Sequence, residues 1–388
     1  MTPPARLQAA IDLLDIVVEA ARANGAAADT LIARWFAEHR YAGAKDKRAI
    51  RDLVYRAVRA FGAPPKSGRA AFAALARHDA EIATAFDGSL YGPAVLDPVE
   101  PRTERQLMPS WLGGMIDRDE HAALLARAPL DLRVNRLKTT RAAVQSIWPE
   151  AVAVVGLEDA LRLDPPIAIE ATDAWRDGLV DVQDAGSQWV VQACRAAPEM
   201  TAIDLCAGGG GKTLALAAAM AGQGRLVACD TDRTRLSRLA PRAARAEAVI
   251  ETRLLDPMIE KHVLGDLTGA ADLVLVDAPC SGTGTFRRNP EARWRLNSKR
   301  LDALVALQSH VLDVAMPLVK PGGVLVYAVC SLLTREGADQ AAAFLSRHRG
   351  WRAEPPFAVG RPDGPGRKLS PAHDATDGFF VARLIAPC

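Results

Sequence analysis

The sequence is poor in features that would by themselves assign a function. Aromatic residues make up 5% of the 388 residues, and the formal net charge is +2. So few aromatic side chains argue against an extended base-stacking surface. A nearly neutral chain also lacks the global basic field of many nucleic-acid-binding proteins. Any contact with a polyanion would therefore depend on local basic clusters.

Cysteine pairs and long apolar runs are also missing. None of the six cysteines is spaced Cys-x-x-Cys, and they do not cluster with the seven histidines, so we expect no metal site. No apolar run approaches the ~18 residues of a membrane span, and the first residues make a poor signal peptide. The sequence predicts a soluble, cytoplasmic protein without a membrane partner.

One stretch organises the rest of the chain. Residues 201–213 read Thr-Ala-Ile-Asp-Leu-Cys-Ala-Gly-Gly-Gly-Gly-Lys-Thr. The first part is typical of a short apolar strand, the glycines of a turn, and the residues after Lys212 of a helix. Nucleotide-like ligands bind at such corners, because backbone N–H groups and a helix N-terminus can approach them closely.

The glycine spacing separates the possible ligands. A P-loop would need glycine at 206, which is Cys206, and a dinucleotide fingerprint starting at Gly208 would need glycine at 213, which is Thr213. An adenosine-type ligand without a pyrophosphate remains. Asp230 ends the next apolar strand, where an acid can hold both hydroxyls of a ribose. The alternative is a plain tight turn, with Asp230 capping the following helix.

Alternating helices and strands over 186–388 predict the main domain. Continuous apolar strands joined by crossover helices imply an α/β fold with a doubly wound, mostly parallel sheet. Ligands in such sheets lie beyond the carboxyl ends of the strands. We expect strands at 201–207, 225–230, 249–255, 272–277, 323–329 and 379–384, and a long helix at 297–318.

Two further domains are expected before the main one. Apolar residues at helical spacing over 5–62 and helical character over 70–84 predict an all-helical domain at 1–90. A linker and a small α/β lobe should follow over 91–185. The basic residues from Lys45 to Arg59 fit either a solvated helix face or an RNA-contacting one.

The strand-end rule gathers acids and cysteines on one rim of the sheet. Asp230, Asp256 and Asp277 each follow a predicted strand, and so do the loops that carry Cys280 and Cys330. Cysteines buried elsewhere are usually small hydrophobes. Two of them at the ends of neighbouring strands can instead face one cleft above the adenosine-type ligand.

S-adenosylmethionine fits an adenosine ligand without phosphates, and one methyl acceptor explains a thiolate beside it. Carbon 5 of a pyrimidine becomes nucleophilic when a thiolate adds to carbon 6. The adduct must then lose the proton on carbon 5 and expel the thiol, so a second group that helps release is useful. Asp277 is placed to stabilise charge near ring nitrogen 3.

These motifs, in this order, resemble the RsmB/Sun family of RNA cytosine-5 methyltransferases, whose catalytic domain has the Rossmann-like class I methyltransferase fold. The helical N-terminus resembles the NusB-like RNA-binding domain of its ribosomal RNA members. The matching segments are Arg133-Val-Asn135, Gln183-Asp-Ala-Gly-Ser-Gln188, Asp204-Leu-Cys-Ala-x-x-Gly210-Gly-Lys-Thr213, Asp277-Ala-Pro-Cys-Ser-Gly-Thr-Gly284 with Arg287-Arg-Asn-Pro290, Tyr327-x-x-Cys330-Ser331 and Asp377-Gly-Phe-Phe380.

The resemblance implies a nucleophile and a set of cofactor contacts. It makes Cys330 the nucleophile and Cys280 the residue that assists release. DNA cytosine-5 methyltransferases use the cysteine of their Pro-Cys motif instead, so this assignment rests on the resemblance alone. The implied contacts to S-adenosyl-L-methionine come from Cys206, Ala207, Gly208, Gly209, Gly210, Gly211 and Lys212, from Asp230 at the ribose, from Asp256 near the adenine and from Asp277.

Two positions depart from the family pattern. Gly209 stands where the family usually has proline, and Val329 stands where it has threonine. Neither removes a catalytic group, so we expect an active enzyme. We also interpret the basic run from Arg287 to Arg300 as phosphate contacts near the target base, with Trp294 in the core.

The expected function is methylation of carbon 5 of a cytosine in RNA, with 16S ribosomal RNA as the substrate and the protein acting as a monomer. The alternatives are a transfer RNA methyltransferase, a catalytically silent RNA-binding ribosome assembly factor and a P-loop NTPase.

Overall fold

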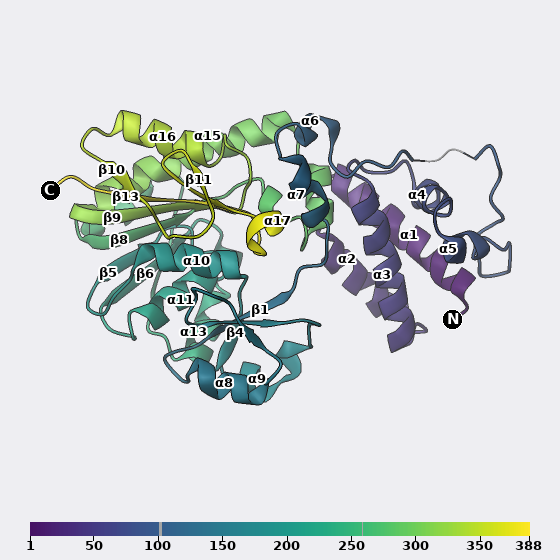
Figure 1. The fold of residues 1–388 in the computed structure, drawn as a ribbon, viewed down its shortest axis with the longest axis horizontal. Coiled ribbons are helices and arrows are strands. Elements are labelled where there is room, and N and C mark those ends of the chain that lie inside the picture. Colours follow the sequence, from purple (N-terminus) through teal and green to yellow (C-terminus); the bar gives the residue numbers. More distant parts are fainter. Residues whose placement is uncertain (101–102, 258) are drawn as a thin grey trace. The chain divides into compact units, whose positions relative to one another are not determined.

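The computed structural model describes residues 1–100, 103–257 and 259–388. Within them the chain forms two compact units, one of residues 1–127 and 285–297 and the other of residues 128–284 and 298–388 (Figure 1). The segment 285–297 lies far along the chain but packs with the first unit. The boundaries of the three predicted domains remain a prediction, and each unit is described by itself below.

The first unit is helical, and its longest helices bury one apolar face each. In α1 (Pro3–Arg22) the predicted stripe that includes Leu7, Ile11 and Leu14 is buried. The predicted helix over 70–84 is divided in two, because the Asp79 carboxylate accepts the N–H groups of residues 81 and 82 and starts a new helix. The helices after α1 are α2 (Ala28–Glu38), α3 (Ala44–Ala60), α4 (Gly68–Leu75), α5 (Ala80–Thr84), α6 (Ser110–Gly113), α7 (Arg118–Ala123) and the 3₁₀ helix η4 (Pro290–Arg295).

The second unit begins with a small antiparallel sheet. Its spatial order is β2 (Val152–Ala153), β3 (Ala160–Leu163), β1 (Leu130–Val134) and β4 (Val180–Val182). It packs with α8 (Arg141–Ile147), η1 (Ile169–Ala171) and α9 (Asp173–Arg176) around a core of its own.

A nine-stranded sheet forms the rest of the second unit and confirms the predicted α/β doubly wound fold. β9, β8, β5, β6 and β7 are parallel, and β13 pairs antiparallel with β9. The spatial order is β11 (Arg361–Asp363), β12 (Gly366–Leu369), β13 (Phe379–Ile385), β9 (Val319–Val329), β8 (Ala271–Asp277), β5 (Thr201–Asp204), β6 (Arg225–Asp230) and β7 (Glu251–Leu254), and β10 (Arg352–Glu354) pairs with β13.

Helices cover both faces of this sheet. Figure 1 shows α15 and α16 on one side and α10 and α11 on the other, and each pair contributes to a separate apolar cluster with the strands. The helices are α10 (Ala185–Cys194), α11 (Gly211–Ala219), α12 (Arg233–Leu236), α13 (Leu239–Ala246), α14 (Glu260–Val263), α15 (Ser298–Ala315), α16 (Ala338–Arg347) and α17 (Pro371–Asp374), with 3₁₀ turns η2 (Gly265–Leu267), η3 (Thr283–Thr285) and η5 (Met316–Leu318).

One segment of the described residues, Ser298–Leu318, is long and apolar enough to cross a membrane by length and composition alone, with a mean hydropathy of 1.3. It comprises α15 and η5. Since α15 contacts β8, β9 and α16, its apolar face belongs to the core of the second unit. A core helix passes the same test.

Candidate active site

The predicted rim is the carboxyl edge of the parallel strands. β5 ends at Asp204, β6 at Asp230, β8 at Asp277 and β9 at Val329. Because these strands are parallel neighbours, the loops that follow them leave the sheet at one edge. Asp256 lies two residues after β7 ends and is exposed.

The glycine loop after β5 is shaped by its backbone. Gly208 and Gly210 adopt φ of +54° and +83°, which glycine reaches without strain. A Cβ on Gly210 would lie 2.1 Å from Leu239 Cδ1, so a larger residue cannot replace it without moving its neighbours. α11 starts at Gly211, and its first N–H groups are available for a ligand.

Asp230 ties this loop to the next strand. One carboxylate oxygen accepts the Gly208 N–H at 2.7 Å, and the other accepts the Asp232 N–H at 2.7 Å. Each oxygen keeps a second lone pair. A ribose with two adjacent hydroxyls fits this acceptor, and the glycine cradle fits an adenosine lying over it.

Three further contacts fix the glycine loop. The Ala207 N–H donates to the Cys229 carbonyl at 2.8 Å, and Arg242 Nη1 donates to the Gly209 carbonyl at 2.6 Å. Gln183 Nε2 donates to the Gly211 carbonyl at 3.1 Å. Burial, followed by the nearby aspartates, raises the pKa of the Cys206 thiol well above its usual range, so Cys206 is not a nucleophile here.

Lys212 forms an ion pair with Asp277 across the rim. Lys212 Nζ lies 2.6 Å from Asp277 Oδ2 and 5.3 Å from the centre of the Phe379 ring. Burial alone would lower the pKa of Lys212, but the Asp277 carboxylate outweighs it and raises that pKa. The lysine therefore stays protonated and is engaged by a carboxylate, unlike the phosphate-binding lysine of a P-loop.

The two predicted cysteines meet at this edge. Cys280 Sγ lies 3.3 Å from Cys330 Sγ, and both side chains are partly buried. The hydrogen bond to the Cys330 sulfur, then burial and the charges of Cys330 and Glu336, raise the pKa of Cys280 well above the usual thiol range. The Cys280 thiol therefore keeps its proton in the unreacted site.

Backbone hydrogen bonds join the loops that carry the motifs. The Gly284 N–H donates to the Cys330 carbonyl at 3.1 Å, and the Gly378 N–H donates to the Gly284 carbonyl at 2.8 Å. A Cβ on Gly284 would lie 2.1 Å from the Gly378 oxygen, so this approach requires glycine. The Asp377 N–H donates to Asp184 Oδ1 at 3.0 Å. Four motifs that are far apart in the sequence thus meet beside the cysteines.

Polar side chains behind the cysteines were missed by the sequence reasoning. Glu336 and Gln308 are both fully buried and lie among the residues that hold the cysteine loops. Gln308 was detectable, because it falls on the buried stripe of α15 where apolar residues are expected. Glu336 lies in an irregular loop, where no periodicity marks it.

Two arginines in the middle of the basic run from Arg287 to Arg300 do not have the predicted role of phosphate contacts. Arg293 is fully buried and its Nη2 donates to the carbonyls of Val58 and Phe61, at 2.7 and 2.9 Å, inside the first unit. Arg295 donates to the Ala26 carbonyl at 2.7 Å. Both arginines donate to backbone carbonyls of the first unit, so the phosphate-contact interpretation is wrong for them. Trp294 is buried, as predicted for a core residue.

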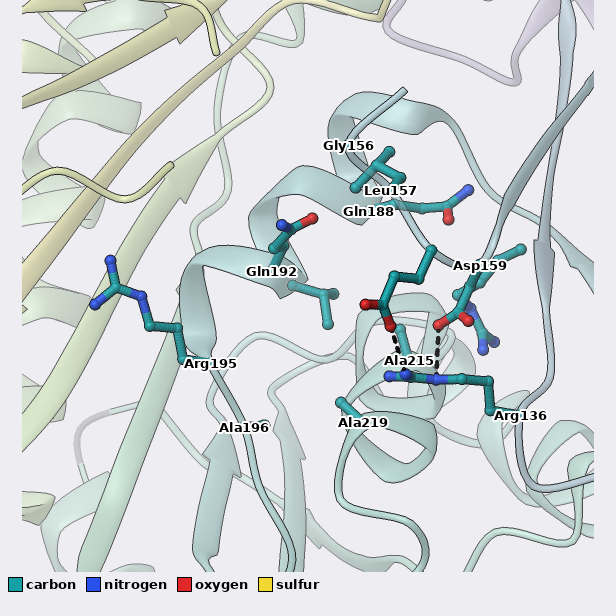
Figure 2. Close-up of a pocket in the computed structure, with 13 residues that line it drawn as sticks. Arg136, Gly156, Leu157, Asp159, Gln188, Gln192, Arg195, Ala196, Ala215 and Ala219 are labelled. Carbon is teal, nitrogen blue, oxygen red and sulfur yellow. Dashed lines mark hydrogen bonds and ion pairs between the residues drawn. The ribbon is translucent and has the colours of Figure 1, made fainter. Parts of the chain in front are cut away.

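A cavity of about 340 Å³ lies elsewhere in the second unit (Figure 2). It lies beside α10 and α11, and Arg136 at its edge pairs with Asp159 and Glu158, each at 3.0 Å. No residue of the predicted site lines it. The candidate site is therefore the rim, not this cavity.

Comparisons with known proteins point to one family. The family described as "16S rRNA methyltransferase RsmB/F" matches residues 191–385. A "Probable ribosomal RNA small subunit methyltransferase B" from Synechocystis sp. is 36% identical over 305 residues, 72% of this chain and 67% of the relative. A "Ribosomal RNA small subunit methyltransferase B" from Pectobacterium atrosepticum is 36% identical over 299 residues, 72% of this chain and 66% of the relative.

A solved structure extends the likeness in fold. The crystal structure of PH0851 covers 99% of this chain and 99% of its own, with a TM-score of 0.79 and 23% identity. The matches to the two sequence relatives span about two thirds of those relatives' lengths.

Proposed function

The chain belongs to the RsmB/F family of S-adenosylmethionine-dependent 16S rRNA methyltransferases, and from this premise we propose that it methylates carbon 5 of a cytosine in 16S ribosomal RNA. The observation that carries the proposal is the pair of thiols, 3.3 Å apart, at the carboxyl edge where the cofactor loop also ends. Methyl acceptors that are already nucleophilic need no thiolate, whereas carbon 5 of cytosine does.

Cys330 is the proposed nucleophile. Its thiolate adds to carbon 6 of the cytosine, which breaks the ring double bond and places the electron pair on carbon 5. The charge of Cys330 is among the causes that raise the pKa of Lys212, so the lysine cation interacts with the reacting sulfur. When bound, S-adenosylmethionine supplies the methyl group that carbon 5 takes up. Asp277, which ends β8 on the same rim, is the proposed acid that stabilises charge near ring nitrogen 3.

Cys280 is proposed to complete the reaction. The first cause of its raised pKa is the hydrogen bond with the Cys330 sulfur. Once that sulfur is bonded to carbon 6 it is an uncharged thioether, and this cause is removed. Cys280 can then release its proton to water, and the resulting thiolate accepts the proton on carbon 5. The electron pair of the broken C–H bond re-forms the ring double bond and expels the Cys330 thiolate.

The target cytosine must be unpaired or extruded, since a stacked base cannot receive a thiolate at carbon 6. The helical first unit is proposed to hold the surrounding RNA. Lys45, Arg48 and Arg51 are exposed on α3, and they offer phosphate contacts that the buried Arg293 cannot. We also infer a cytoplasmic enzyme that acts as a monomer and needs no metal.

The RNA role of the first unit is tested by changing these three side chains to alanine. Deletion of the helical domain would be a poor test, because Arg293 and Trp294 depend on its carbonyl groups. The triple variant should bind RNA more weakly, with a shallower salt dependence, and should keep its affinity for S-adenosylmethionine. Unchanged RNA affinity at each salt concentration would contradict this role.

Methyl transfer tests the reaction and its substrate. Unmodified 16S ribosomal RNA and a transfer RNA pool are incubated with labelled S-adenosylmethionine, and the methylated nucleoside is identified by mass spectrometry. We expect 5-methylcytosine in the ribosomal RNA only. Label in transfer RNA alone would favour a transfer RNA methyltransferase. No label in either RNA, with cofactor binding intact, would favour a silent assembly factor.

A further inference from the structure

Behind the two thiols lies a carboxylate that faces neither solvent nor the rim. Glu336 follows Cys330 by six residues in the chain and is fully buried. Burying a charge is costly unless hydrogen bonds replace the lost water. The donors that surround Glu336 therefore indicate what this residue is for.

Four donors point at the two oxygens of Glu336. Oε1 accepts the Ser281 backbone N–H at 2.8 Å and Gln308 Nε2 at 3.0 Å. Oε2 accepts the Ser331 hydroxyl at 2.5 Å and also the Ser281 hydroxyl. An ionised carboxylate only accepts hydrogen bonds, so this arrangement fits a charged Glu336.

The donors come from the two loops that carry the cysteines. Ser281 directly follows Cys280, and Ser331 directly follows Cys330. One carboxylate thus bonds to the neighbour of each thiol. Gln308 extends the link, since its Nε2 also donates to the Pro279 carbonyl at 2.9 Å, just before Cys280.

Glu336 is itself fixed in place. The Tyr327 hydroxyl donates to the Glu336 carbonyl oxygen at 2.5 Å, and Tyr327 is a buried residue of β9. The carboxylate is therefore anchored to the strand from which the Cys330 loop departs. Thr283 closes the arrangement, because its hydroxyl lies 3.0 Å from the Ser331 hydroxyl and accepts the Leu332 N–H at 3.0 Å.

We infer that Glu336 is the positioning residue of the site. By bonding to Ser281 and Ser331 it holds Cys280 and Cys330 at a separation that lets Cys330 attack carbon 6 and Cys280 remove the proton on carbon 5 of the same base. Glu336 touches no reacting atom and acts through the two serines. The inference rests on the proposed function, since it assumes that both thiols take part in one reaction.

The electrostatics agree with this role. After the Cys330 sulfur and burial, the charge of Glu336 is among the causes that raise the pKa of Cys280. The same carboxylate that sets the distance between the thiols thus helps to keep Cys280 protonated while Cys330 attacks.

The test compares two substitutions of Glu336 with one substitution of its hydrogen-bond partner Ser331. Glu336→Leu keeps the volume and removes both acceptors. Glu336→Gln keeps one acceptor, and its amide can donate to the two serine hydroxyls, which can accept. Ser331→Ala cuts the link to the Cys330 loop and leaves the buried carboxylate, in case Glu336→Leu fails to fold. Glu150→Leu, at an exposed position of the second unit, is the matched control.

Two readouts are measured on the full-length protein. The first is kcat and KM for methyl transfer, together with the Kd for S-adenosylmethionine. The second is the rate at which diamide, which takes up the two thiol hydrogens, joins Cys280 and Cys330 in a disulfide, followed by mass spectrometry. The second readout reports the thiol separation and needs no methyl transfer, so it remains valid if the proposed function fails.

We expect Glu336→Leu, or Ser331→Ala in its place, to lower kcat by about 100-fold, the effect of displacing a reacting group by about 1 Å. The Kd for the cofactor should stay within about twofold, disulfide formation should slow by about tenfold or more, and Glu336→Gln should recover most of both rates. Folded Glu336→Leu and Ser331→Ala variants with wild-type kcat and wild-type disulfide rates would overturn the inference. So would a Glu336→Gln variant as impaired as Glu336→Leu.

Discussion

The cofactor loop and the pair of cysteine loops share one edge of the sheet but are held in different ways. Gly208 to Gly211 take their shape from backbone conformation and from close packing against neighbours. The cysteine loops are joined by the backbone hydrogen bond from Gly284 to Cys330 and, in addition, by side chains around one buried carboxylate, Glu336. The first arrangement shapes a surface for a ligand that must bind and leave. The second fixes two reacting atoms relative to each other.

A buried acid lies under each region, and the two acids differ in their donors. Asp204, beneath the cofactor loop, receives the Thr213 hydroxyl at 2.7 Å. Glu336 receives four donors from three residues. The stability contributed by Asp204, beneath the cofactor loop, should therefore depend on pH. The activity of the cysteine pair should depend on the hydrogen bonds to Glu336.

The largest effect should come from removing the nucleophile. Cys330→Ala should lower kcat by about 10³-fold or more, because it removes the proposed nucleophile that adds to carbon 6. S-adenosylmethionine binding, measured by calorimetry, should be unchanged, since the cofactor loop is held independently. If Cys330→Ala kept its activity while Cys280→Ala lost it, the two thiols would have the opposite roles.

A smaller but still large effect is expected at the backbone contact between the Cys280 loop and Gly378. Gly284→Ala would place a Cβ against the Gly378 oxygen, so it should destabilise the protein by about 1–3 kcal/mol and lower activity. Thermal unfolding measures the first effect. Gly209→Ala is the control, and equal losses in both variants would remove the distinction between the two regions.

The pH dependence of stability tests the acid under the cofactor loop. Burial raises the pKa of Asp204 to about 7, although the Thr213 hydrogen bond acts in the opposite direction. An acid with a raised pKa binds its proton more tightly in the folded state, so its stabilisation is present at low pH and is lost as the pH rises through about 7.

The expected loss of stability follows from the raised pKa of Asp204. Between about pH 5 and pH 8, wild type should lose about 2–3 kcal/mol of unfolding free energy relative to Asp204→Asn. Urea unfolding at both pH values measures it. Parallel stability curves for the two proteins would show that Asp204 stays ionised throughout.

Cofactor affinity should depend on the carboxylate that links the glycine loop to β6. Asp230→Ala removes the acceptor of the Gly208 N–H as well as the proposed ribose contact. We expect the Kd for S-adenosylmethionine to rise by about tenfold. Wild-type affinity in this variant would contradict the ribose assignment.

The smallest effect is expected where the chain departs from the family pattern. A Cβ on Gly209 would meet only Arg242 Nη1, at 3.6 Å, and Gly209 is not among the glycines with positive φ. Gly209→Ala should therefore stabilise the protein by about 0.4–1 kcal/mol by restricting the unfolded chain. A loss of stability would show that the loop needs the freedom of glycine at this position.

These regions also differ in how far the sequence predicted them. The strands, the rim and the glycine loop follow from apolar runs and glycine spacing, which are local properties of the chain. The family and the cofactor were inferred from motif order, and both are confirmed by the comparisons. Glu336 could not be found in this way, because its partners come from residues 281, 308 and 331, which only the fold brings together.

Glu336 was missed by the sequence, whereas the basic run was assigned a role that the structure contradicts. Six basic residues between Arg287 and Arg300 predicted a surface for phosphates, but Arg293 and Arg295 donate to backbone carbonyls of the first unit. Charge in a sequence does not reveal whether an arginine faces solvent or a buried carbonyl group. Only the positions of the acceptors decide it.

The most direct test of the account is to trap the covalent intermediate. Cys280→Ala and the double variant Cys280→Ala/Cys330→Ala are each incubated with 16S ribosomal RNA and S-adenosylmethionine, and the products are separated under denaturing conditions. We expect a stable protein–RNA adduct that carries the methyl group in Cys280→Ala and no adduct in the double variant. An adduct that persists without Cys330, or none in Cys280→Ala while methyl transfer continues, would contradict the division of roles between the two thiols.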